Sequence, residues 1–553
     1  MKHNITLFES HNQYETYITS NDVSLPNVSF CKNKNEVHYK QIDFSKRYLA
    51  TIARESGTIS FNIAQGLGTN FITSISYSID DGETWTTTAN QDNKEENLVI
   101  SVNVNEGDKV LWKGIAETIC DMSDGVSYFT STCEFDVQGN VMSLCYGDNF
   151  IGQTTLNYTL QFGLLFGAAF FEGNCSVVNA KDLSLPATTL TDMCYFLMFG
   201  GCTSLVTAPA LPATTLADYC YQGMFQGCTS LVTAPALPAT TLADYCYSEM
   251  FYGCTSLTIA PSVLPATTLA TYCYSNMFNS CTSLTSAPEL PATTLASYCY
   301  NFMFKGCTSL TTAPELPATT LSEYCYSTMF YGCTSLTSAP VLPATTLAGV
   351  CYNDMFYGCT SLTSAPVLPA TILADWCYNG MFRDCTSLTT APSVLPATTL
   401  TDYCYEYMFR GCTSLTTAPE LPATTLAQSC YADMFLGCTS LTTAPQLSAT
   451  TLANGCYDSM FRGCTSLTTA PVLPGTTLAH SCYYYMFAEC SNLNYIKAMF
   501  TTTPSGSSPN YYTYNWVQGV AATGTFVKNS AAQWNVSGVH GVPSGWNVQT
   551  ASE

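Results

Sequence analysis

The chain has 553 residues, of which 47% are hydrophobic and 13% aromatic, whereas only 10% carry a charge. Acidic residues outnumber basic ones 39 to 17, which gives a formal net charge of -22. This balance excludes binding to the nucleic-acid backbone, which needs clustered Lys and Arg. Low charge density with many aromatic residues is typical of a folded chain. No apolar run is long enough to cross a bilayer, and the first residues lack the apolar core of an export signal, so we expect neither a membrane span nor a Sec signal.

Residues 1–45 show no strong periodicity, and we interpret them as an N-terminal attachment segment. Residues 46–150 alternate apolar and polar positions, with Gly, Asp and Asn between the runs, which predicts a small β-sandwich domain. Within it, residues 78–85 (SIDDGETW) resemble the Asp-box hairpin of sialidases and other β proteins. In that motif Asp and Gly shape a tight turn, so we expect this copy to be structural.

Residues 151–193 are predicted to form a cap and a degenerate first repeat. Residues 170–175 read FFEGNC, an irregular version of the MFxGC motif in later copies. A terminal repeat must cover the open end of a shared core, so an irregular and apolar first copy is expected there.

Residues 194–490 repeat one motif twelve times, of the form CYxxMFxGCTSLTTAPxLPATTLAxY, with a period of 26 that twice stretches to 27. Repeats of this length stack to bury a common core, which predicts a solenoid. In a typical copy, Thr294 is expected to cap a short helix that ends at Gly306. Residues 309–313 predict a short strand, which Pro314 ends. The expected fold is therefore an α/β solenoid of leucine-rich-repeat type.

The sequence contains 29 cysteines, and most of them occupy two fixed positions of the repeat, as Cys299 and Cys307 do. We interpret them as small buried hydrophobic residues that stack from copy to copy. Disulfides within a copy are an alternative, although eight residues of straight helix would hold the two Cα atoms too far apart. Zinc is a second alternative, but no CxxC pair occurs. We expect reduced thiols.

Residues 491–553 close the sequence with Trp516, Trp534 and Trp546 among Gly and Pro turns. This composition predicts a small β cap on the far end of the array.

The pattern CxxLxxxPxLPxxxLxxxxYxxMFxGC resembles the BspA-like class of leucine-rich repeat, found in bacterial surface antigens. Met-Phe stands where that family has Ala-Phe, and Cys follows three residues after Phe in both. The resemblance covers about residues 170–495 and implies an adhesin or surface protein that binds host proteins or glycans. Secreted members carry a signal segment, which this sequence does not show.

The flanks resemble another group. Residues 8–39, 146–150 and 524–550 are similar to segments of structural, fibre-type proteins of crAss-like phages that infect gut Bacteroidetes. This resemblance implies a virion protein that is assembled in the host cytoplasm and exposed outside. It would attach to other virion proteins through its N-terminal region and could form a homo-oligomer such as a trimer.

Variation between the copies concentrates in the two residues after CY and the one after MF. It is interpreted either as drift on a solvated face or as a recognition surface, because Tyr and Arg supply much of the contact energy at interfaces. The candidate ligand-contact residues are Asn301, Phe302, Lys305, Asn353, Asp354, Tyr357, Arg383, Glu406, Tyr407, Arg410, Tyr484 and Tyr485. A further candidate is the strand face, whose hydroxyls suit either polysaccharide binding or solubility: Thr311, Thr312, Glu315, Thr416, Thr417 and Glu420.

No GxSxG, HExxH, Walker or dinucleotide-binding motif occurs, so we expect no enzyme, no cofactor and no bound metal. The predicted function is adhesion by a phage virion fibre or spike-like component, whose array contacts a bacterial surface or a mucosal glycan or protein receptor. A bacterial cell-surface adhesin is the first alternative. A virion decoration protein without a receptor is the second.

Overall fold

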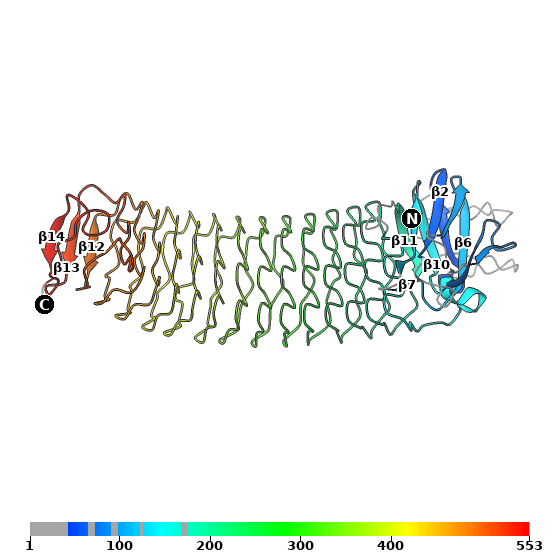
Figure 1. Ribbon diagram of the computed structural model, residues 1–553, viewed down its shortest axis with the longest axis horizontal. Coiled ribbons are helices and arrows are strands. Elements are labelled where there is room, and N and C mark those ends of the chain that lie inside the picture. Colours follow the sequence, from blue (N-terminus) through cyan, green and yellow to red (C-terminus); the bar gives the residue numbers. More distant parts are fainter. Residues whose placement is uncertain (1–41, 65–71, 90–97, 122–124, 168–174, 552–553) are drawn as a thin grey trace, which may run out of the picture.

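A computed structural model describes residues 42–64, 72–89, 98–121, 125–167 and 175–551. Almost all of the predicted attachment segment, residues 1–45, therefore lies outside the described residues. The molecule is elongated and gently curved, with a β domain at the N-terminal end, a long stack of coils, and a small β cap at the C-terminal end (Figure 1). None of the described helices is long and apolar enough to cross a membrane.

The regular elements lie almost entirely at the two ends of the molecule (Figure 1). In chain order they are η1 (Phe44–Lys46), β1 (Leu49–Ala53), β2 (Gly57–Ile63), β3 (Ile72–Ser78), β4 (Thr86–Ala89), β5 (Leu98–Val104), β6 (Lys109–Ala116), β7 (Cys120–Asp121), β8 (Gly125–Val126), β9 (Tyr128–Ser131), β10 (Phe135–Asn140), α2 (Ser143–Tyr146), η2 (Gly147–Asn149), β11 (Val177–Ser184), β12 (Tyr495–Ala498), β13 (Thr525–Lys528) and β14 (Asn547–Thr550).

The N-terminal domain contains two larger sheets that share a core and the short hairpin β7-β8. One has the strand order β11-β10-β1-β6-β3-β4 and the other β5-β2-β9. Trp112 of β6 lies 5.2 Å from Phe129 and 6.3 Å from Phe61 between ring centroids, so the two sheets meet through aromatic side chains. The buried indole Nε1 of Trp112 donates a hydrogen bond to Thr51 Oγ1 at 3.0 Å, which satisfies the polar end of the ring.

Strand β11 joins this domain to the stack of coils. It pairs in parallel with β10, and its Asn179 forms a parallel bridge with Thr207 of the first full coil. Aromatic packing follows the same route, because Phe166 stacks on Phe129 at 5.3 Å and on Phe199 at 5.2 Å. The β domain thus covers the open end of the repeat core.

Each coil contains a segment of overlapping turns where the sequence predicted a helix. In the representative coil, the amides of Asn301, Met303 and Lys305 donate to the carbonyl three residues earlier at 3.1–3.2 Å. The residues between them bond instead to the next coil, as Tyr300 N does to Cys325 O at 3.0 Å and Phe304 N to Met329 O at 2.9 Å. Every second amide therefore forms a hydrogen bond within its own coil, and the amides between them form hydrogen bonds to the next coil. We call residues 296–307, and their equivalents in other coils, the turn segment.

The predicted helix is wrong for a conformational reason. Tyr298, Phe302 and Gly306 have φ of +58°, +56° and +71°, at every fourth position of the turn segment. Positive φ at the third residue of a hydrogen-bonded turn is typical of type II turns and is incompatible with an α-helix. The left-handed conformation costs a non-glycine residue roughly 1–2 kcal/mol, and the hydrogen bonds to the next coil offset that cost.

The strand predicted in each coil is shorter than expected. Residues 309–313 form no extended strand, and Thr312 makes only isolated parallel bridges, with Ser286 of the preceding coil and Ser338 of the following one. A second line of bridges joins Thr294 to Thr268 and Thr320, so Thr294 pairs between coils rather than capping a helix. The coils are nonetheless joined by hydrogen bonds along the turn segments and along these two lines of bridges.

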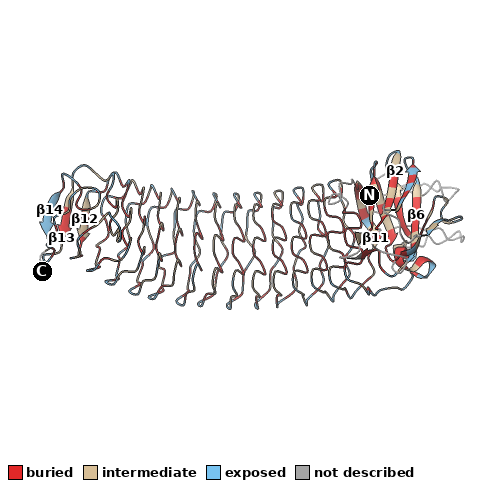
Figure 2. Ribbon diagram, in the orientation of Figure 1, coloured by how far each residue is buried: buried red, intermediate tan, exposed pale blue. Residues whose placement is uncertain are grey.

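The core of the stack is a set of ladders. Along the turn segment, two residues that point inward are followed by two that point outward. The inward residues are fully buried: Cys299, Tyr300, Met303, Phe304 and Cys307. Each ring packs face to face on its equivalents, so that Phe304 lies 5.6 Å from both Phe278 and Phe330. Figure 2 shows these buried positions recurring along the coils.

The repeat cysteines are buried free thiols, as predicted. The second cysteine of each coil donates its S–H to the phenylalanine carbonyl of the preceding coil, as Cys307 Sγ does to Phe278 O at 3.1 Å. Burial raises the pKa of this thiol to about 12, so it stays protonated and unreactive.

The C-terminal end is closed by a three-stranded parallel sheet, β12-β13-β14. Tyr495 of β12 bridges to Thr469 of the coil before the last, and the buried ring of Trp516 lies 6.1 Å from Phe487 of the last coil. Trp534 stacks on Phe500 at 5.3 Å. These tryptophans cover the last rung of the core.

Candidate functional site

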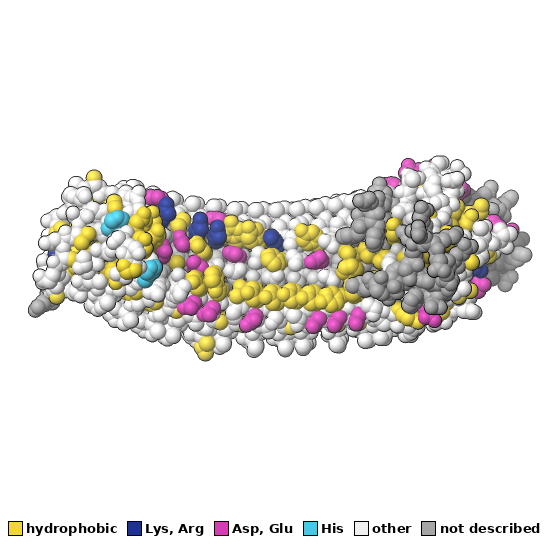
Figure 3. Space-filling view, viewed as in Figure 1, with side chains coloured by type: hydrophobic (Ala, Val, Ile, Leu, Met, Phe, Trp, Pro, Cys, Tyr) yellow, Lys and Arg dark blue, Asp and Glu magenta, His cyan; other side chains and the backbone are white. Residues whose placement is uncertain are grey.

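The outward residues of the turn segments form a continuous surface, which we call the turn face. Figure 3 shows it as a hydrophobic band near the β domain, with the Lys and Arg side chains farther along the array. The twelve predicted contact residues lie on this face. They are not freely exposed, because neighbouring coils cover part of each side chain, and Asn301 and Glu406 are buried.

Arginine and tyrosine side chains alternate in the C-terminal half of the turn face. The Arg383 guanidinium lies 4.9 Å from the ring centroid of Tyr357 and 5.5 Å from that of Tyr407. Arg410 lies 5.4 Å from the same Tyr407 ring. Cation–π attraction of this kind fixes the orientation of long side chains that would otherwise be mobile.

Four carboxyl groups lie among these cations, of which that of Glu406 is buried and the others are partly buried. Burial raises the pKa of Asp354 and Asp433 to about 6, although nearby arginines oppose the shift. Burial also raises the pKa of Glu406 and Asp458 to about 7, and the two groups' proximity to the Asp433 carboxylate adds to the shift. Asn379 Nδ2 donates to Glu406 Oε2 at 2.8 Å, which favours the charged form. These carboxyls therefore change charge near neutral pH.

We call this group the charged cluster: Asp354, Tyr357, Arg383, Glu406, Tyr407, Arg410, Asp433, Asp458 and Arg462. At its far end Arg462 donates to Glu489 Oε1 at 2.9 Å and lies over the Tyr485 ring at 5.1 Å. Tyr485 and Tyr484 pack edge to face at 4.9 Å. The cluster thus presents fixed cations, rings and titratable carboxyls together.

The N-terminal half of the turn face has different chemistry. One tyrosine from each of five successive coils stacks on the next, with centroids 4.4–4.5 Å apart. We call this set the tyrosine ladder: Tyr219, Tyr245, Tyr272, Tyr298 and Tyr324. Two coils after Tyr324, Trp376 stacks on Tyr403 at 4.2 Å.

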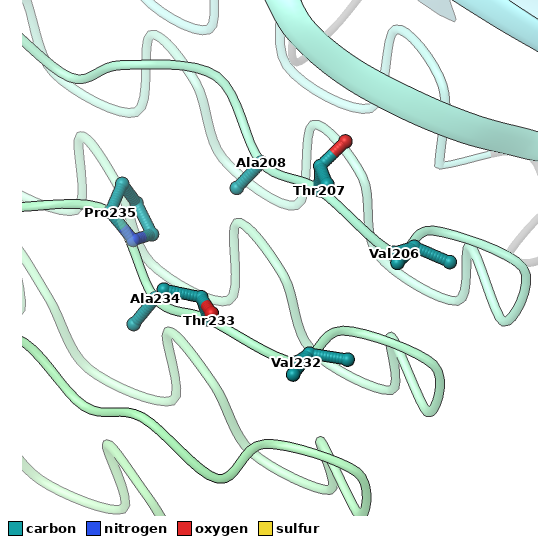
Figure 4. A pocket seen from close by; sticks show the side chains of 7 residues that line it. All are labelled: Val206, Thr207, Ala208, Val232, Thr233, Ala234 and Pro235. Atoms are coloured by element: carbon teal, nitrogen blue, oxygen red, sulfur yellow. The ribbon is translucent and has the colours of Figure 1, made fainter. Parts of the chain in front are cut away.

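The strand face carries the threonines considered as a further candidate. Thr311, Thr312 and Glu315 are exposed, as are their equivalents Thr416, Thr417 and Glu420. Thr311 Oγ1 donates to Thr285 O of the preceding coil at 3.5 Å, so its hydroxyl also joins the coils. Near the β domain the same face has a shallow hollow of about 380 Å³ between two coils (Figure 4), lined by Val206, Thr207, Ala208, Val232, Thr233, Ala234 and Pro235.

The side chains of the Asp-box motif stabilise the turn that the motif forms. Asp80 Oδ1 accepts hydrogen bonds from Ser78 Oγ at 2.6 Å and from Thr84 N at 2.9 Å, and Ser78 Oγ also accepts one from Gly82 N at 2.9 Å. The hydrogen bonds that the Asp80 carboxylate accepts from Ser78 and Thr84 lower the pKa of Asp80 to about 2. Trp85, at the end of the motif, packs edge-on against Tyr48 at 5.1 Å. Within the described ranges, no three His, Cys, Asp or Glu side chains converge as a metal site would require.

Comparison with known proteins assigns the repeats. Residues 174–311, 271–416 and 377–514 match the family model of the BspA type leucine rich repeat region, with six copies of that region in all. These matches extend over more than half of the 553 residues. The chain belongs to the BspA-type leucine-rich repeat family.

A solved relative is a leucine-rich repeat protein from Bacteroides ovatus. It is 21% identical, and the alignment covers 54% of this chain and 80% of the other, with a TM-score of 0.31. No curated protein matches this chain. The family match begins at residue 174 and therefore leaves most of the N-terminal β domain outside it.

Within the BspA-type array, the predicted contact residues fall into three groups. Asp354, Tyr357, Arg383, Glu406, Tyr407 and Arg410 belong to the charged cluster. Asn353 lies beside them, with its Nδ2 donating to Asn379 Oδ1 at 3.1 Å. Lys305 lies over the Phe302 ring at 4.9 Å, and Asn301 donates to Ser327 O at 3.1 Å, so these three form a separate group. Tyr484 and Tyr485 end the surface.

Sequence reasoning missed Asp433, Asp458 and Arg462, although they occupy the same variable positions of later copies. It also missed the tyrosine ladder, because Tyr298 was counted with Tyr300 among the apolar residues of the predicted helix. The available signal was the recurrence of Tyr directly before the first cysteine in five successive copies.

Proposed function

We propose that this chain is a non-enzymatic adhesion protein that binds a receptor on a cell surface, a glycan or a protein, through the charged cluster of its BspA-type array. The observation that carries this proposal is the separation of constant and variable residues within one segment. Inward positions repeat the same Cys, Tyr, Met and Phe, whereas outward positions change and gather Arg and Tyr. Side chains of these two types dominate binding energy at interfaces.

Several copies displayed together would strengthen weak contacts by avidity. Membership in a family of repeat proteins also supports a binding role, since stacked coils provide a long surface. The virion location stays a prediction from the flanking segments, as does attachment through the N-terminal region. Display on a bacterial cell surface is the alternative location. Neighbouring capsid and tail genes would favour the virion.

The test is binding of the full-length chain to bacterial cells and to a glycan array. We expect the triple variant Arg383→Ala, Tyr407→Ala, Arg410→Ala to lose at least ten-fold in affinity. The matched control is Thr311→Ala, Thr312→Ala, Thr416→Ala on the exposed strand face, which should bind as the parent does. Full-length protein that binds neither probe, or a triple variant that binds normally, would contradict the proposal.

A further inference from the structure

The tyrosine ladder is a narrow apolar strip that nothing in the described chain covers. Its rings stack face to face at 4.4–4.5 Å, so their faces are already occupied. What remains open to solvent is a line of ring edges and phenol groups. Figure 3 shows a continuous hydrophobic band on this part of the array. The ladder members are half-buried, and the core tyrosines two residues farther along, such as Tyr300, are fully buried.

The charge around this strip is mostly negative. Residues 182–304 contain no Lys, Arg or His, but they include the acidic residues Asp182, Asp192, Asp218, Asp244, Glu249 and Glu289. Lys305 is the single basic residue between the first and the last ladder tyrosine, and its ammonium group lies over the Phe302 ring. Exposed acids directly precede three of the ladder tyrosines, namely Asp218, Asp244 and Glu323.

Backbone amides fix two of these carboxylates. Asp218 Oδ1 accepts from Asp244 N at 3.0 Å and Asp244 Oδ1 accepts from Thr271 N at 2.8 Å. Each keeps its second oxygen for a partner, and each is held beside the ladder.

We infer that the tyrosine ladder docks an extended, positively charged polypeptide segment of a partner protein. The strip is straight and crosses five coils, which suits an extended chain of about five or six residues at ~3.3 Å each. Apolar side chains of the segment would lie on the ring edges, and its Lys or Arg side chains would meet the row of carboxylates. This surface and this partner are distinct from the receptor and the charged cluster of the proposed function.

The charge pattern also selects against other occupants. A second copy of the chain would bring a net charge of -22 toward a region whose single basic residue is Lys305. Nucleic acid would be repelled for the same reason. Complementary charge accelerates and orients docking, whereas like charge opposes it.

The test uses two synthetic peptides, one alternating Lys with Val and Tyr, and the other with Glu in place of each Lys. Fluorescence anisotropy with the full-length chain should show binding of the Lys peptide only, weakened by salt. We expect Tyr272→Ala, Tyr298→Ala to lower that affinity at least ten-fold. The charge variant Asp218→Asn, Asp244→Asn, Glu323→Gln keeps the rings and should lower it by a similar factor, so one variant remains if the other folds poorly.

The charged-cluster variant Arg383→Ala, Tyr407→Ala, Arg410→Ala should bind the Lys peptide as the parent does, which separates this inference from the proposed function. Equal binding of the two peptides, no binding of the Lys peptide, or retention of its binding by both ladder variants would overturn the inference. So would a dimer of the full-length chain that the tyrosine substitutions abolish, because a second copy would then be the occupant.

Discussion

Along the turn face, the coils next to the β domain present stacked tyrosines beside carboxylates, whereas the later coils present arginines between tyrosines and partly buried carboxyls. Both halves rest on the same turn segment and the same core ladders. The outward positions contribute little to the shared core, so their chemistry can differ without a change of fold. One backbone therefore carries two surfaces of different chemistry.

The largest effect is expected from substitutions in the core, where both halves of the array should lose the same stability. Phe304→Ala and Phe382→Ala each remove a ring stacked at 5.6 Å between two neighbours. We expect each to lower the free energy of unfolding by about 3–5 kcal/mol. Urea denaturation followed by circular dichroism measures both. A clear difference between the two losses would show that the halves do not share one core.

The next test uses the pH dependence of stability, to which the partly buried carboxyls of the later coils should contribute. The pKa values of Glu406 and Asp458 are raised from about 4 in the unfolded chain to about 7, so the folded protein holds their protons more tightly. That contribution to stability is present in full below about pH 4 and is lost as pH rises through about 7. Glu406→Gln, Asp458→Asn should flatten the fall in stability between pH 5 and 8, on the order of 1–2 kcal/mol after allowance for solvent screening.

Thermal denaturation over this pH range measures the effect. Glu315→Gln, Glu420→Gln on the exposed strand face is matched in charge and reports what net charge alone contributes. An unchanged pH slope in the cluster variant would mean that these carboxyls do not titrate as the structure indicates.

The tyrosine ladder should contribute much less to stability than the core beside it. Tyr298→Ala removes two stacked contacts at 4.4 Å, which we expect to cost about 1–2 kcal/mol. Tyr300→Ala removes a fully buried ring and should cost about 3–5 kcal/mol. Measured side by side in urea, equal losses would mean that Tyr298 is a core residue and that the ladder is no surface.

The spacing of the apolar residues determines how much of the fold and of the candidate site could be predicted from the sequence. Two inward residues followed by two outward ones give a period close to that of an α-helix, so the sequence identified Cys299, Met303 and Phe304 as core and the variable positions as surface. The same spacing arises from overlapping turns. The overlapping turns differ from a helix in two ways: they form backbone hydrogen bonds to the next coil, and they have positive φ at Tyr298 and Phe302. The sequence has no glycine at these two positions that would indicate the positive φ.

The smallest expected effect concerns that backbone conformation. Asp384 has φ of +55° where most coils have glycine, as at Gly358 with φ of +71°. Asp384→Gly removes the strain of a left-handed aspartate and should stabilise the protein by about 1 kcal/mol. The loss of its exposed contact with Arg383, at 3.8 Å, should cost little. A gain in urea midpoint with unchanged receptor binding would show that Asp384 is no part of the charged cluster. A loss of stability would instead mean that the Asp384 carboxylate holds Arg383 between its two tyrosines.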